Sequence, residues 1–132
     1  MDYDKLSGNI ELPNSINEMG DAAFSGCSSL TGNLILPNNL TVIPGSVFEY
    51  CTGFIGPIII PENVTKISYY AYSYCKGFSG DLIIPSTVTE IGYGAFRECT
   101  GLNGILNVSA QIDTLEEYTF YGCTGITGIV AF

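Results

Sequence analysis

Apolar positions recur along this chain at a fixed spacing of 24 residues. The period is marked by six glycines: Gly8, Gly32, Gly56, Gly80, Gly104 and Gly128. After each glycine two apolar residues alternate with an outward position, as in Leu34-Ile35-Leu36, which is typical of a short strand with one buried face. Proline follows four of these segments and ends the strand, because it has no amide hydrogen for a sheet ladder.

The second half of each unit returns apolar residues to the same interior. Val64 and Ile67 are an example, and an aromatic residue stands three positions before each cysteine: Phe24, Phe48, Tyr72, Phe96 and Phe120. One unit cannot bury these side chains alone, but stacked units can bury them against their neighbours. The pattern therefore predicts a repeat solenoid with one continuous parallel β-sheet, its strands about 4.8 Å apart, joined by turns and with little helix.

The repeats make one domain, 1–132. Counted from the apolar residue before each glycine, the units run 6–29, 30–53, 54–77, 78–101 and 102–125, with a partial unit at 126–132. The last unit stops inside a strand without a polar cap, which places Ile126, Val130 and Phe132 at an open end. We therefore expect either a piece of a longer array or end-to-end self-association.

Four short strings carry a family resemblance. Cys99-Thr-Gly-Leu102, the strand ending in Ile-Ile-Pro, the Val-Thr-x-Ile step and the Ala-Phe-x-x-Cys closure resemble the BspA-like (Treponema pallidum-type) leucine-rich repeats. The resemblance covers essentially the whole chain, although the recurrent glycine adds one residue to the spacer before the strand. It implies a right-handed leucine-rich-repeat coil, and a cell-surface or secreted protein for adhesion and recognition without enzymatic activity.

Composition excludes several other functions. The net charge is −9, with 13 acidic residues against Lys5, Lys66, Lys76 and Arg97, so a basic stripe for nucleic acid cannot form. Contact with an anionic membrane surface is disfavoured for the same reason. No histidine is present, which removes the usual general base, and no phosphate-binding loop occurs. We expect no catalysis and no cofactor. No apolar run could span a bilayer, and the polar first residues argue against a signal peptide.

The cysteines form one column: Cys27, Cys51, Cys75, Cys99 and Cys123. Residues one coil apart stack about 5 Å from each other, and cysteine behaves as a small buried hydrophobe, so we expect a structural column of free thiols. Disulfides between neighbours are the alternative, but an odd number would leave one over. No Cys-x-x-Cys pair is present, so a zinc site is not expected.

Two outward-facing groups are candidate binding surfaces. Ile35, Ile59 and Ile83 occupy the middle of successive strands and predict an apolar stripe on the exposed sheet face, although isoleucine also simply favours strands. Tyr50 and Tyr74 should stack on adjacent coils, and Tyr69 and Tyr93 form a second such pair, either for recognition or as half-buried turn packing.

Three N-x-[ST] sequons begin at Asn39, Asn63 and Asn107. The first two share one repeat position, so they are either incidental products of the repeat or glycan sites of a secreted protein.

The function expected from the sequence is non-catalytic binding. A host or extracellular-matrix protein is the expected partner, with a carbohydrate as a further one. The rival interpretation is a structural spacer or self-assembling solenoid, and a weaker one is a secreted inhibitor or carbohydrate-binding module.

Overall fold

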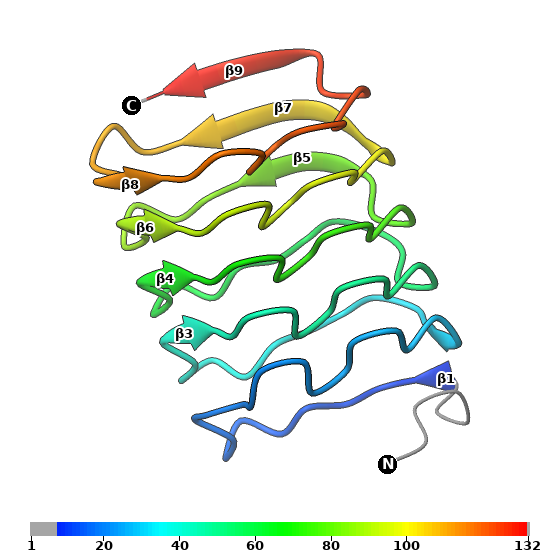
Figure 1. Cartoon of the computed structure of the whole chain (residues 1–132). Coiled ribbons are helices and arrows are strands. Elements are labelled where there is room, and N and C mark those ends of the chain that lie inside the picture. Colours follow the sequence, from blue (N-terminus) through cyan, green and yellow to red (C-terminus); the bar gives the residue numbers. More distant parts are fainter. Residues whose placement is uncertain (1–7, 132) are drawn as a thin grey trace.

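The chain folds into a stack of flattened coils, as the repeats require. The computed structural model describes residues 8–131, so Lys5, Leu6 and Phe132 lie outside it, as do the first residues used to argue against a signal peptide. The coils rise in order from β1 at one end to β9 at the other (Figure 1). Residues 8–131 contain strands, isolated bridges and turns but no helix. The predicted leucine-rich-repeat solenoid is confirmed.

Nine short strands are present in the described range: β1 (Gly8–Asn9), β2 (Leu30–Thr31), β3 (Val42–Ile43), β4 (Lys66–Ile67), β5 (Gly80–Ile83), β6 (Glu90–Ile91), β7 (Leu102–Val108), β8 (Thr114–Leu115) and β9 (Gly128–Ala131). All of their pairings are parallel.

The strands form two ladders. The first follows the recurrent glycine and contains β1–β2, the isolated bridges Gly32–Phe54 and Gly56–Phe78, and β5–β7–β9. The second, β3–β4–β6–β8, lies at the Val-Thr-x-Ile step and forms a separate column of short arrows in Figure 1. The prediction of one sheet was therefore incomplete. Coils of equal length stay in register around the whole turn. Equivalent residues can therefore pair here as well as in the first ladder, and Ile43 pairs with Ile67.

The last coil departs from the 24-residue register. The sequence pattern placed Val130 in the interior column with Leu106, but Leu106 pairs with Ile129 and Val130 pairs with Asn107. Earlier coils shift register at a left-handed glycine, such as Gly80 at φ +83°. Gly104 and Gly128 do not have positive φ, and each is followed by isoleucine, a strong strand former. The strand therefore runs on without the bulge, and Ile129 takes the place beside Leu106, where at the last described coil it is 70% exposed.

Aromatic rings form the centre of the core. In the column predicted to be buried, ring centroids lie 6.0 Å apart for Phe24–Phe48, 5.5 Å for Phe48–Tyr72, 5.3 Å for Tyr72–Phe96 and 5.6 Å for Phe96–Phe120. The three central rings are almost completely buried. Each coil thus packs its ring on the next, which explains why no unit is stable alone.

A second glycine column sets how closely the coils approach. It follows the last four Cys-x pairs at Gly53, Gly77, Gly101 and Gly125, whereas Ser29 follows the first. A Cβ added to Gly77 would overlap the backbone carbonyl oxygen of Phe54 in the preceding coil. Only glycine fits where two backbones lie this close.

Candidate functional site

The cysteine column is a hydrogen-bonded ladder inside the fold. No disulfide is present, and each of the last four thiols donates to the carbonyl oxygen of the aromatic residue 27 positions earlier. The Sγ–O distance is 2.9 Å for Cys75 and Phe48, and 3.1 Å for Cys99 and Tyr72. Burial raises the pKa of Cys51 to about 12 and that of Cys75 well above its usual value. These thiols stay protonated at neutral pH and are poor nucleophiles.

Cys123 differs from the rest of the column. It is only partly buried, at the end of the stack where β9 lies. Hydrogen bonding with the Cys99 thiol lowers the pKa of Cys123, and the same interaction raises the pKa of Cys99. Cys123 is therefore the most reactive thiol of the last four.

Asn39 and Asn63 stack at the corner after the proline. Both are exposed, and their Nδ2 atoms donate to the carbonyl oxygens of Asn14 (3.3 Å) and Asn38 (2.9 Å). Asn107 lies instead half buried on β7, and its Oδ1 has no hydrogen-bond partner in the described residues. The three sequons therefore occupy two different environments, and only the first two present an exposed side chain.

The isoleucine row consists of Ile35, Ile59 and Ile83, which lie at equivalent positions of consecutive coils. Only Ile83 lies in a strand, at the end of β5, so the expectation that all three occupy strands is wrong for Ile35 and Ile59. Their side chains are 64%, 51% and 56% exposed. The row ends at Asn107, the strand partner of Ile83. Its rim is polar and acidic, and a shallow hollow between two coils is lined by Ile59 and Ile83 together with Glu62 and Asp81.

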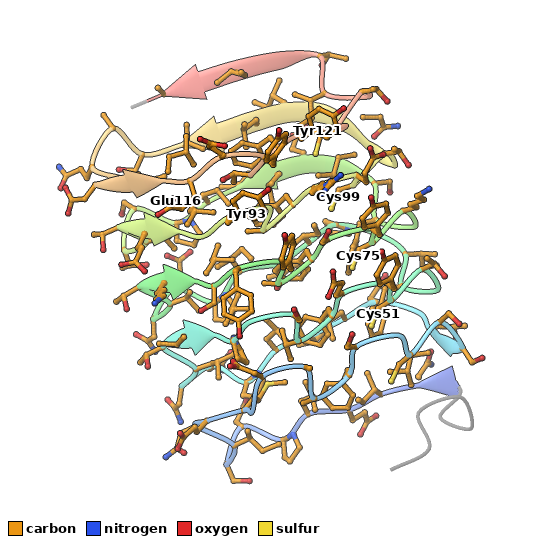
Figure 2. The ribbon with its side chains drawn as sticks, in the orientation of Figure 1. Cys51, Cys75, Tyr93, Cys99, Glu116 and Tyr121 are labelled. Carbon is orange, nitrogen blue, oxygen red and sulfur yellow. The ribbon has the colours of Figure 1, made fainter. Side chains whose placement is uncertain are left out.

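The tyrosine surface lies on the return side of the coils, between the second ladder and the cysteines; Figure 2 shows two of its members, Tyr93 and Tyr121. It consists of Tyr50, Tyr69, Tyr70, Tyr74, Tyr93, Tyr118 and Tyr121. Tyr50 and Tyr74 stack with centroids 4.8 Å apart and rings 16° from parallel, as the spacing predicted.

Tyr69 and Tyr93 do not form the direct stack that their spacing suggested. Tyr70 lies between them, with its ring centroid 6.3 Å from Tyr69 and 5.4 Å from Tyr93, edge to face in both cases. The ring of Tyr69 turns instead over Gly45, where a side chain would collide with it. Its hydroxyl donates to Asp21 Oδ2 at 3.1 Å, two coils away. This hydrogen bond raises the pKa of Tyr69 and ties three coils together.

Arg97, Tyr118 and Tyr121 were missed by the sequence analysis. The Arg97 Cζ atom lies 5.8 Å from the ring centroid of Tyr74, 5.7 Å from that of Tyr118 and 5.5 Å from that of Tyr121. One signal was available, because Tyr118 and Tyr70 share a repeat position two units apart. Gly94 stands between them in the column, and a Cβ there would press against the Tyr70 ring.

Four members of the tyrosine surface adopt a backbone conformation that favours glycine. The φ angles are 61° at Tyr50, 53° at Tyr70, 61° at Tyr74 and 58° at Tyr118. All equivalent positions in the other coils also have positive φ: glycine holds three of them (Gly26, Gly94 and Gly122), and Ala22, Ser46 and Glu98 hold the others. A bulky residue in this region costs on the order of 1 kcal/mol or more. Because the same conformation recurs in every coil, this strain is a property of the repeat turn and does not by itself mark the tyrosines as functional.

No group of three or more Cys, Asp or Glu side chains within residues 8–131 could hold a metal ion. The same part of the chain has no helix long and apolar enough to cross a membrane.

Two solved structures share the fold. A leucine-rich repeat protein from Bacteroides ovatus ATCC 8483 is 22% identical with a TM-score of 0.73, over 98% of this chain and 31% of that one. The T. pallidum leucine rich repeat protein is 24% identical with a TM-score of 0.56, over 89% of this chain and 66% of that one. The chain thus spans about a third of the first protein and just under two thirds of the second.

Comparison with curated proteins finds no match. The sequence itself matches the BspA type leucine rich repeat region in six copies across residues 3–127. That match covers almost the whole length. The column of stacked aromatic rings, here called the aromatic spine, and the cysteine ladder explain why aromatic residues and cysteines recur in the repeat. The chain therefore belongs to the family of BspA type leucine rich repeats.

Proposed function

We propose that this chain is a non-catalytic adhesion module of a cell-surface or secreted protein, and that it binds a host or matrix protein through the isoleucine row. Leucine-rich repeats generally mediate protein interactions, their solenoids are typically non-catalytic, and BspA-type proteins are commonly surface-associated. The specific partner class and the binding face are our proposal.

The observation that carries the proposal is the exposure of the isoleucine row. Single exposed apolar residues are ordinary, but Ile35, Ile59 and Ile83 are each more than half exposed and continue from coil to coil. A preference of isoleucine for strands accounts only for Ile83, since Ile35 and Ile59 lie outside the strands. It does not explain why three successive outward positions have isoleucine while Glu11 and Asn107 occupy the same column.

Charge around the row indicates the chemistry of the partner. Glu62 and Asp81 line the hollow beside Ile59 and Ile83, and the chain as a whole has a net charge of −9. A complementary protein would present apolar side chains surrounded by lysine or arginine.

The experiment compares a triple variant with a matched control. Proteins captured from matrix extract by the immobilised chain are identified and purified, and their affinities are then measured. The variant Ile35→Ser, Ile59→Ser, Ile83→Ser should weaken binding by at least about 100-fold, because truncating central apolar contacts costs more than about 1 kcal/mol each. The control Val42→Ser with Leu115→Ser removes exposed apolar side chains from the second ladder and should bind like the parent chain. Equal affinities for the triple variant and the parent would refute the assignment of this face.

A structural spacer or self-assembling array is the second candidate function. Phe120, Cys123, Ile126 and Ile129 line an apolar hollow beside β9. Within the described residues only β7 pairs with β9, so its other edge is open to strand addition. Sedimentation over a concentration series distinguishes the two candidates, since self-assembly predicts a mass that rises with concentration and adhesion through the isoleucine row does not.

A further inference from the structure

We propose that Arg97 and the tyrosines around it form a second binding site, for a sugar that has a single carboxylate, such as a uronic or sialic acid of a surface glycan. This site lies on the return side of the coils and does not depend on the isoleucine row.

Unpaired positive charge is concentrated at this one place. Within residues 8–131 the positively charged side chains are Lys66, Lys76 and Arg97. Lys66 forms an ion pair with Glu90, with Nζ and Oε2 3.0 Å apart. Lys76 and Arg97 both lie 5.8 Å from the ring centroid of Tyr74, and neither side chain has a hydrogen bond or ion pair with the residues of the described range. A chain with a net charge of −9 thus keeps two cations, without a carboxylate partner in the described range, near the ring of Tyr74.

The setting of Arg97 favours a carboxylate as the charged group. Its Nε atom is shielded from solvent and has no hydrogen-bond partner, whereas its two Nη atoms are not among the shielded polar atoms. Contact with the tyrosine rings restricts the guanidinium, so its end can meet both oxygens of a carboxylate with little further loss of entropy.

The neighbouring side chains fit the rest of a sugar. Tyr118 and Tyr121 are about half exposed, with centroids 5.2 Å apart and rings 80° from parallel, so they offer an apolar face and a polar tip beside Arg97. Glu98 lies against Gly122, next to Tyr121, where its carboxylate can accept hydrogen bonds from sugar hydroxyls. An aromatic face together with a few convergent polar groups is typical of a small-molecule site.

The acidic surroundings limit the charge that the ligand can have. Glu98 follows Arg97 in the chain. Loss of solvent around the Tyr93 hydroxyl and its neighbours, Glu117 among them, raise the pKa of Tyr93, and nearby Arg97 only partly opposes this rise. A ligand with one negative charge would be attracted by the two cations. A sulfated glycan or an acidic peptide has many negative charges and would be repelled by these carboxylates. The observations therefore favour a monoanionic sugar over a polyanion or an acidic protein segment.

The test titrates the intact, isotope-labelled chain and follows its amide resonances by NMR. The ligands are N-acetylneuraminic acid, glucuronic acid, N-acetylglucosamine and a hexaglutamate peptide. We expect at least one sugar acid to bind with a Kd in the millimolar range, with shifts centred on residues 93–98 and 117–122, and the neutral sugar and the peptide to bind at least tenfold more weakly. A comparison of the two acids distinguishes a sialic from a uronic source.

Variants identify the groups responsible. Arg97→Gln should reduce sugar-acid affinity at least tenfold, and Tyr121→Ala should reduce it severalfold. Lys66→Gln, which removes the same charge from the second ladder, should leave it unchanged. Circular dichroism checks each fold, and if Arg97→Gln does not fold, the exposed Tyr121→Ala decides. Several results would overturn the proposal: no shifts with either acid, equal binding of the neutral sugar, unchanged affinity in a folded Arg97→Gln, or tighter binding of the peptide, which would indicate a protein ligand.

Discussion

Replacing Tyr72 with phenylalanine should stabilise this protein. Tyr72 is the one tyrosine in a column otherwise made of phenylalanines, and it is completely buried between Phe48 and Phe96. Its hydroxyl has no hydrogen-bond partner among the described residues. Burial raises the pKa of this phenol well above its ordinary value, which is a second sign that the group has lost its water without compensation.

The expected gain follows from two opposing terms. An unpaired buried hydroxyl costs about 1–3 kcal/mol, and Tyr72→Phe removes that cost. The variant leaves a void of roughly 10 Å³, which costs only about 0.2 kcal/mol at about 24 cal/mol per Å³. The ring, its stacking and its rotamer are unchanged. The net effect is an increase of about 1–2.5 kcal/mol in the free energy of unfolding, and a melting temperature higher by roughly 3–10 °C.

Urea unfolding followed by circular dichroism, with thermal melts in parallel, measures this effect. The matched control is Tyr74→Phe, which removes the same atom from a half-exposed ring that stacks only on Tyr50 in its column. That substitution should change stability by less than about 0.5 kcal/mol. A Tyr72→Phe protein that is less stable than the parent, or no more stable than the control, would show that the hydroxyl is satisfied and the reasoning wrong.

Three further predictions concern the coil contacts. Because the folded pKa of Cys51 is raised from 9.0 to about 12, its neutral thiol stabilises the fold fully below pH 9. That contribution should be lost as pH rises from about 9 to 12, measured as a falling urea midpoint, which a Cys51→Ala variant should show to a smaller degree. In native thiol titration at neutral pH Cys123 should react before Cys51 and Cys75, and simultaneous reaction of all three would contradict the buried ladder. Gly77→Ala should cost about 1–3 kcal/mol, because the added methyl overlaps a backbone carbonyl that cannot move without separating two coils. Gly20→Ala, where the new Cβ meets nothing, is its control, and equal stabilities of the two would refute the close-approach argument.

The sequence alone determined the solenoid and its core. A residue that recurs every 24 positions must stack on its own copy if each unit forms one coil, so the aromatic spine, the cysteine column and the outward isoleucine row could all be read from column positions. The same arithmetic explains the ring stack of Tyr50 on Tyr74. These features depend on period and polarity, which are properties of the chain before it folds.

Only the tertiary structure determined the register of the last strand, the side-chain rotamers and the contacts between different columns, because the 24-residue period does not predict them. The register slip that exchanges Val130 for Ile129 depends on the sign of φ at a glycine, and glycine allows either sign. The turn of Tyr69 towards Asp21 is a choice of rotamer, made because Gly45 leaves room for the ring. Arg97 contacts tyrosines of the neighbouring coils, and these tyrosines stand at repeat positions whose residue type changes from one unit to the next. Contacts between unlike columns leave no periodic trace in the sequence, and they arise only when the folded coils bring those side chains within reach.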